Sequence, residues 1–233
     1  VRTEQNAAHA ASGLARVSDQ VGVCAVTSGP GATNLITGIA TAFADSIPMV
    51  CITGQVNSEL IGSDVFQEAD ITGAVESFVK YSYLVKDVED IPRIFKEAFH
   101  IANTGRKGPV LIDVPIDVQL AAISKFKYPQ EVKLRTYKPT VKGNMVQIKK
   151  VAKELSKAKR PLICAGGGVL LSDAKEVLYM AAVQGARAIG LADCDSLAPG
   201  KQADIIIIDL HQPNMKPLNN LTKNIVYSGS KQN

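Results

Sequence analysis

Short apolar runs alternate with longer Ala-rich or amphipathic stretches along the first half of the chain. An apolar run of four to eight residues bounded by turn residues is typical of a buried strand, and an Ala-rich stretch favours a helix. Strands are predicted at 21–26, 48–53 and 109–114, and helices at 4–17, about 32–44 and 90–104. In the last helix Asp90 is the candidate N-cap and Pro92 falls in the first turn. This alternation predicts an α/β fold, a parallel sheet with helices on both faces.

The pattern changes in the second half of the chain, where periodicity is lost and Lys and Pro become frequent. The predicted elements are a linker at 116–142, a helix at 144–158, a strand with a glycine turn at 161–169, a short helix at 179–191, and strands at 203–210 and 224–228. These elements predict a partial α/β unit and then a short β-rich tail. We therefore expect three segments, at 1–120, 121–178 and 179–233.

Charge is distributed unevenly along this globular composition of 46% hydrophobic and 21% charged residues. The net charge is +4, yet twelve Lys or Arg and only two acids lie between Lys125 and Arg160. Such a stretch could bind nucleic acid or form a solvated linker and helix face. The second interpretation is favoured, because few aromatic residues are interleaved for base stacking. We therefore expect no nucleic-acid partner.

Cysteine usage and hydropathy indicate a cytoplasmic protein. Three of the four cysteines sit in apolar runs and none forms a CxxC pair, which predicts buried thiols in a reducing compartment. No apolar stretch approaches the ~18 residues that a membrane span requires, so no membrane association is expected. Because the chain opens at Val1 in a helical pattern, without Met, we also expect an upstream portion.

Three segments carry candidate chemistry. Glu4 opens the first predicted helix, where an acid is also favoured simply by the helix dipole. The turn TSGPGATN at 27–34 follows a buried strand and could bring backbone close to a ligand, or could be a tight structural turn. The segments ITGQV at 52–56 and IGSDVFQEAD at 61–70 follow the next strand, where α/β proteins place ligands, although an ordinary polar loop would look similar.

Four ordered motifs resemble one family. They are RTEQNAAHAASGLAR, VGVCAVTSGPGATNLITGIATAFADSIPMVCITGQV, IGSDVFQEADI and GPVLIDVPIDVQ. Together they resemble the large, catalytic subunit of acetolactate synthase, a thiamine-diphosphate enzyme, from Val1 to about Leu178. The resemblance implies condensation of 2-oxo acids such as pyruvate with decarboxylation, in branched-chain amino-acid biosynthesis. It also implies that residues 1–120 form the pyrimidine-binding domain and that a central FAD-binding domain begins afterwards.

The same resemblance assigns roles to individual residues. Glu4 would hydrogen-bond the aminopyrimidine ring and exchange a proton with it, and an apolar site would raise its pKa. The remaining implied roles are cofactor contacts for Pro30 and Asn34, a place near the reaction centre for Gln55, substrate contacts for Phe66, Gln67 and Lys80, and an FAD turn for Gly166, Gly167 and Gly168. His9 is interpreted as a helix-packing residue rather than a catalytic one.

The family pattern is incomplete in this sequence. It has no GDG triplet, which in the family begins the motif that holds Mg²⁺ and the diphosphate. Each family subunit supplies half of an active site between two subunits, so we expect a homodimer or pairing with an intact large subunit, and by family a regulatory small subunit. The chain alone is expected to be inactive, as a fragment or a chimera.

The end of the chain, residues 179–233, resembles a second family, which indicates a chimera. VQGARAIGL, DSLAPGKQADIIIIDL and HQPNMKPLNNL resemble the C-terminal end of amidohydrolases of the methylthioadenosine and S-adenosylhomocysteine deaminase type. Such enzymes bind metal through paired histidines, whereas His9, His100 and His211 are unpaired, so no metal site is expected. The alternatives to acetolactate synthase activity are therefore a metal-dependent amidohydrolase and a non-catalytic module that pairs with an intact subunit.

Overall fold

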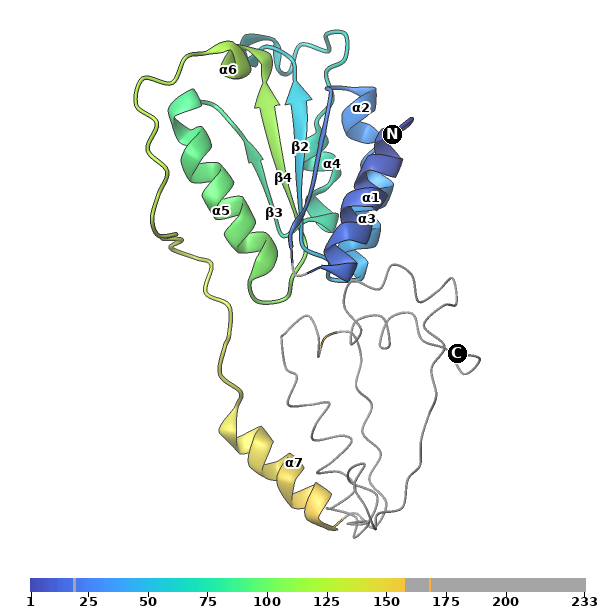
Figure 1. Ribbon diagram of the computed structural model, residues 1–233, viewed down its shortest axis with the longest axis vertical. Coiled ribbons are helices and arrows are strands. Elements are labelled where there is room, and N and C mark those ends of the chain that lie inside the picture. Colours follow the sequence, from blue (N-terminus) through green and yellow to red (C-terminus); the bar gives the residue numbers. More distant parts are fainter. Residues whose placement is uncertain (19, 158–167, 169–233) are drawn as a thin grey trace, which may run out of the picture. The chain divides into compact units, whose positions relative to one another are not determined.

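The computed structural model describes residues 1–18, 20–157 and 168. The chain divides into two compact units, 1–141 and 142–233. The first unit holds a sheet of four parallel strands, β1 (Gly22–Val26), β2 (Met49–Gln55), β3 (Tyr81–Leu84) and β4 (Pro109–Pro115) (Figure 1). Their order is β1-β2-β4-β3, so β2 and β4 are central. Every residue of β4 is buried, which explains why its sequence is apolar except for Asp113.

Helices cover both faces of this sheet, as the sequence predicts (Figure 1). One face packs against α1 (Glu4–Val17), α3 (Ile36–Ala44) and α4 (Ile71–Ala74), and the other against α5 (Ile91–Asn103). Neighbouring strand residues point to opposite faces: Cys51 and Leu111 belong to the first core cluster, and Val50 and Ile112 to the second. The remaining helices of the first unit are α2 (Pro30–Thr33), α6 (Ile116–Leu120), η1 (Ser58–Leu60), η2 (Glu76–Phe78) and η3 (Val88–Asp90).

Helix α1 forms where it was predicted because its sequence provides a cap and a small-residue face. The Thr3 hydroxyl accepts a hydrogen bond from the Asn6 amide at 3.4 Å, and Glu4 lies in the first turn. Ala8, Ala11 and Ala15 are buried against the sheet and α3. Ala side chains allow this close packing, so the start of α1 is held in a fixed place above the sheet.

Several details differ from the sequence predictions. The predicted helix at 32–44 is two helices, α2 and α3, and the predicted linker begins with helix α6. Strand β3 was not predicted, because its sequence YSYL is only partly buried at the sheet edge. Asp90 lies at the N-cap position of α5, but its carboxylate pairs with Arg93 instead of capping the helix.

The segment after α6 belongs in part to the first unit. Leu134 and Tyr137 pack against the core cluster beside α5. In the second unit, α7 (Met145–Lys157) matches the helix predicted at 144–158. The strand and glycine turn predicted at 161–169, except for Gly168, and all elements predicted beyond it lie outside the described residues. The three-segment division therefore stays a prediction.

The cysteines of the first unit are buried thiols, as predicted. Cys24 and Cys51 are register partners on β1 and β2, with their sulfur atoms 3.6 Å apart. Cys164 and Cys194 lie outside the described residues. Among the helices that the structure describes, none has the length and apolar character to cross a membrane.

Candidate functional site

The first part of the candidate site is a carboxylate held at the carboxyl edge of the sheet. Parallel strands all end at one edge, and the chain enters α1 and α2 there (Figure 1). The Asn34 side-chain amide, just after α2, donates to Glu4 Oε2 at 2.9 Å. The structure therefore brings together two residues that are 30 positions apart and were both predicted to contact the cofactor.

The expected apolar environment of Glu4 is not found in the described chain. The hydrogen bond from Asn34 and one from a backbone amide lower the pKa of Glu4 below its ordinary value, and burial opposes them only weakly. The expectation of a raised pKa is thus wrong for this state. The physical reason is that Glu4 keeps contact with water at the start of α1, where donors stabilise its ionised form.

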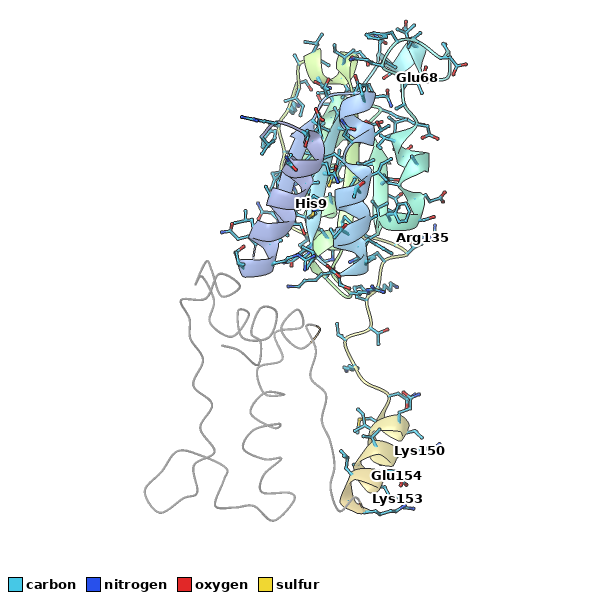
Figure 2. All side chains as sticks on the ribbon, turned by 90° about the vertical axis from the view of Figure 1, so that its right-hand side faces the viewer. His9, Glu68, Arg135, Lys150, Lys153 and Glu154 are labelled. Carbon is cyan, nitrogen blue, oxygen red and sulfur yellow. The ribbon has the colours of Figure 1, made fainter. Side chains whose placement is uncertain are left out.

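The glycine turn after β1 contacts the loop between β2 and α4. Gly29 has a φ of 59°, and a Cβ at this position would lie 2.8 Å from Gln67 Cα. Only glycine allows both this backbone conformation and this close approach. Pro30 follows at the first turn of α2, and Phe66 is 90% exposed on the loop beside Gln67. Figure 2 shows the neighbouring Glu68 at one end of the first unit, away from His9 on α1.

Gln55 lies at the end of β2 in a buried hydrogen-bond network. Its side-chain nitrogen donates to Ala69 O at 2.7 Å and to Asp113 Oδ2 at 3.0 Å. The Thr53 hydroxyl donates to Asp113 Oδ1 at 2.6 Å. Burial raises the pKa of Asp113 to about 6, and the charge of Asp70 adds to this effect.

Sequence reasoning missed Asp113. The signal was present, because Asp113 is the one charged residue inside the apolar strand run PVLIDVP. A second acid that was missed, Asp117 in α6, accepts hydrogen bonds from the Ser58 amide and hydroxyl at 2.9 and 3.0 Å. These bonds lower the pKa of Asp117. The β4–α6 segment thus contacts the loop after β2 directly at Ser58, and through Gln55 at Ala69.

Lys80 lies at the opposite, amino edge of the sheet, immediately before β3. Its ammonium donates to the carbonyl oxygens of Ile101 and Thr104, the latter at 2.7 Å, and to the Tyr137 hydroxyl at 2.8 Å. These acceptors come from the end of α5 and from the segment after α6. The structure therefore does not bring Lys80 together with Glu4, Asn34 and Gln55.

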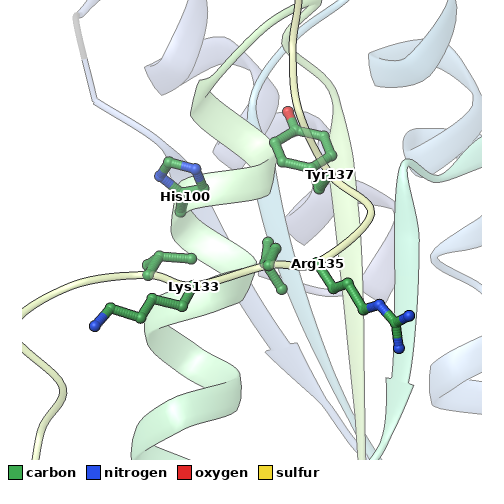
Figure 3. A pocket seen from close by; sticks show the side chains of 6 residues that line it. His100, Lys133, Arg135 and Tyr137 are labelled. Atoms are coloured by element: carbon green, nitrogen blue, oxygen red, sulfur yellow. The ribbon is translucent and has the colours of Figure 1, made fainter.

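The other candidates also lie apart from the carboxyl edge. Gly166 and Gly167 are outside the described residues, and Gly168 is exposed. An open pocket of about 410 Å³ lies beside the last turns of α5, lined by His100, Val132, Lys133, Leu134, Arg135 and Tyr137 (Figure 3). In Figure 3 the Lys133 and Arg135 side chains extend in different directions. Within the described part of the chain, no group of three or more His, Cys, Asp or Glu could hold a metal ion.

Comparison with known proteins finds matches for the N-terminal part of the chain. Residues 1–74 match the family model of the thiamine pyrophosphate enzyme N-terminal TPP-binding domain. An acetolactate synthase large subunit from Buchnera aphidicola (Schizaphis graminum) is 56% identical over 180 residues, 76% of this chain and 31% of the relative. A probable acetolactate synthase large subunit from Methanocaldococcus jannaschii is 54% identical over 76% of this chain and 30% of the relative. An acetolactate synthase from Mycobacterium leprae is 52% identical over 76% and 28%.

The N-terminal part of the chain is therefore similar to thiamine pyrophosphate enzymes, through the match of residues 1–74. Within that family, about three quarters of the chain are similar to acetolactate synthase large subunits. The chain spans about a third of the length of the curated relatives it matches.

The end of the chain matches a different family. Residues 143–232 match the amidohydrolase family model. This match must overlap the acetolactate synthase match, because together the two are longer than the chain. The join predicted near residue 178 stays a prediction.

Proposed function

We propose that the first unit is one half of a thiamine-diphosphate site for acetolactate synthase-type condensation of 2-oxo acids, and that Glu4 is its cofactor-activating acid. The observation that carries this proposal is the Glu4 carboxylate, fixed by Asn34 beside the Gly29–Pro30 turn at the carboxyl edge. Ligands of parallel α/β folds bind at this edge. The similarity to acetolactate synthase large subunits supports the reaction type.

The residues at this edge fit an aromatic nitrogen ring. Glu4 is partly exposed and ionised, so it can accept a hydrogen bond from a ring N–H. Gly31 is buried beside Glu4: a Cβ there would lie 3.8 Å from Glu4 Cγ and 2.6 Å from the Thr27 methyl carbon. A larger residue would fill the space next to the carboxylate. When bound, thiamine diphosphate supplies a carbon acid that adds to the carbonyl of a 2-oxo acid after losing its proton.

The role of Glu4 is to hold a proton between its carboxylate and the ring nitrogen. The low pKa of the exposed carboxylate favours acceptance of a hydrogen bond. Exclusion of water by the ring and by a second wall of the site would raise this pKa toward that of the ring, so that a proton could move in both directions. Gln55 would remain near the reaction centre, and the exposed Phe66 and Gln67 would line the substrate pocket.

A second chain would supply the remaining half of the site. The relatives' names contain the words large subunit, which supports pairing with an intact large subunit, or a homodimer, and with a regulatory small subunit. Mg²⁺ would be held by the partner's half, and FAD by a central domain to which Gly166, Gly167 and Gly168 would contribute. For Lys80 the substrate contact is retained only as a proposal, because its ammonium already has three acceptors. A cytoplasmic location is proposed as well.

A complementation experiment tests the proposal. The chain is co-expressed with an intact acetolactate synthase large subunit in which the activating glutamate is replaced by glutamine, and acetolactate is measured in the copurified complex. We expect activity with the unchanged chain and none with its Glu4→Gln variant. Absence of copurification would overturn the pairing. Copurification with equal, background activity for both chains would overturn the role of Glu4.

The amidohydrolase match favours a second candidate function, a metal-dependent hydrolase or deaminase formed by the end of the chain. Metal analysis of the purified chain tests it. Stoichiometric Zn²⁺ or Fe²⁺ would support this function, and its absence after growth with both metals would exclude it. A chain that copurifies with an intact subunit and lowers its activity would support the remaining alternative, a non-catalytic pairing module.

A further inference from the structure

Asp113 is a buried acid without a cationic partner. Its side chain lies on the central strand β4 and the residue is 1% exposed. None of the salt bridges among the described residues includes Asp113. The nearby charge that acts on it, Asp70, has the same sign. A buried and unpaired carboxylate destabilises a fold, so the contacts that it makes need a reason beyond stability.

Those contacts fix the side-chain amide of Gln55 completely. The two N–H groups of Gln55 point at Asp113 Oδ2 and at the carbonyl oxygen of Ala69. Its side-chain oxygen accepts from the Val56 amide at 2.9 Å. An amide group has two donors on one side and an acceptor on the other, and here each has a partner. The charge of Asp113 selects this orientation, because a carboxylate can only accept.

The same contacts fasten the loop at 56–70, which connects β2 to α4 and carries Phe66 and Gln67. Ala69, near its end, is held through Gln55 by Asp113. Ser58, near its start, is held by Asp117. Between these points, the backbone of Gln67 rests against Gly29. The loop is therefore attached to α6 directly near its start, and to β4 through Gln55 near its end.

We propose that Asp113 is a positioning residue, which orients the Gln55 amide and, through it, fixes the second half of the 56–70 loop. Its consequence for substrate rests on the proposed function, since Phe66 and Gln67 are expected to line the substrate pocket. The positioning itself does not depend on that function. Charge-assisted hydrogen bonds are roughly twice as strong as neutral ones, so a carboxylate holds the loop better than an amide would.

Hydrogen exchange of the full chain tests whether Asp113, through Gln55, restrains the second half of the 56–70 loop. We expect Asp113→Asn to raise the exchange rate of backbone amides at 64–70 by about tenfold, the loss of one charged hydrogen bond. Amides at 57–60, which Asp117 holds, should exchange as before. Gln55→Leu should reproduce the effect, and the double variant should add nothing further. Thr53→Val is the matched control, because it removes a bond to the same carboxylate and leaves Gln55 in place.

Two outcomes would overturn the proposal. One is an unchanged exchange rate at 64–70 in Asp113→Asn. The other is an equal rise over the loop, α1 and α5, which would show that Asp113 supports the fold as a whole. Asp117→Asn gives the reciprocal comparison, since it should loosen residues 57–60 and leave 64–70 as they were.

A spectroscopic readout separates positioning from general support. The side-chain amide resonances of Gln55, followed by NMR, should titrate with a midpoint near the pKa of Asp113, about 6. The titration should vanish in Asp113→Asn. Resonances that stay constant across this range would overturn the coupling of the two side chains. No cofactor is needed in either experiment, so a failed complementation by Glu4 would refute the proposed function and leave this inference standing.

Discussion

At the amino edge of the sheet, the ammonium of Lys80 is enclosed by three oxygen atoms that belong to the fold itself. At the carboxyl edge, Glu4 is bonded to the Asn34 side chain and stays partly exposed, and the neighbouring Phe66 and Gln67 are exposed. Both edges hold charged side chains that the sequence marks as candidates. The difference is that the charge of Lys80 at the amino edge is hydrogen-bonded to oxygen atoms of the same chain, whereas polar side chains at the carboxyl edge remain exposed to a ligand.

The buried acid near the carboxyl edge gives the largest expected effect. The folded pKa of Asp113, about 6, lies above its ordinary value of 3.8, so the folded chain binds this proton more tightly than the unfolded chain. The contribution is fully present below pH 3.8 and is lost as the pH rises to about 6. From well below pH 3.8 to well above pH 6, the unfolding free energy should fall by about 3 kcal/mol in total relative to Asp113→Asn, most of it between pH 4 and pH 7. Urea unfolding of both proteins at pH 4 and pH 7 measures it, and parallel pH profiles would contradict it.

Next in size is the amino edge, where Lys80→Met should lower the unfolding free energy by about 2 kcal/mol. The methionine keeps much of the packing but leaves the acceptors at the end of α5 without a charged donor. Lys86→Met, at a solvent-exposed position, is the control. Equal stability of the two variants would show that Lys80 is not needed for the fold. A ligand contact by Lys80 would then be the better interpretation.

The glycine turn tests how tightly the carboxyl edge is built. Gly29→Ala should lower the unfolding free energy by about 1.5 kcal/mol, because alanine disfavours a positive φ and its Cβ would clash with Gln67. Gly13→Ala, in α1 with open space around it, should instead be neutral or stabilising. Thermal unfolding compares the two. The same response from both would mean that the Gly29 contact is loose.

The smallest expected effect concerns the position of Glu4. Thr3→Ala removes the side-chain cap of α1 and should lower the unfolding free energy by about 0.5 kcal/mol. Because the cap precedes Glu4 directly, hydrogen exchange at the first turn of α1 should rise, while the last turn should not change. Exchange that is unchanged at both ends would show that Asn34 alone holds the start of the helix.

The comparison of edges also shows how far the sequence could predict this molecule. Continuous apolar runs identified β1, β2 and β4, because both faces of the sheet are covered. Strand β3 gave no such signal, because it is a half-buried edge strand. The motif resemblance assigned both Glu4 and Asn34 to the cofactor, and the structure shows a hydrogen bond between their side chains, while their cofactor roles stay a prediction.

Other features depend on tertiary contacts that no local pattern contains. The network of Asp113 requires the register of β2 on β4, in which Thr53 lies opposite Asp113. Likewise, the family resemblance assigned Lys80 a substrate contact, yet its place at the amino edge follows from the direction of β3. The pKa of Glu4 was predicted to be raised because burial was assumed, and the structure leaves the carboxylate in contact with water.

An NMR titration of the ¹⁵N-labelled chain with thiamine diphosphate and Mg²⁺ tests the cofactor site most directly. We expect chemical-shift changes at the carboxyl edge, at Glu4, Gly29 and Asn34, none at Lys80 or Thr104, and weaker changes in Glu4→Gln. Shifts concentrated around Lys80 and Tyr137, or shifts that Glu4→Gln leaves unchanged, would contradict the assignment of the carboxyl edge as the cofactor site.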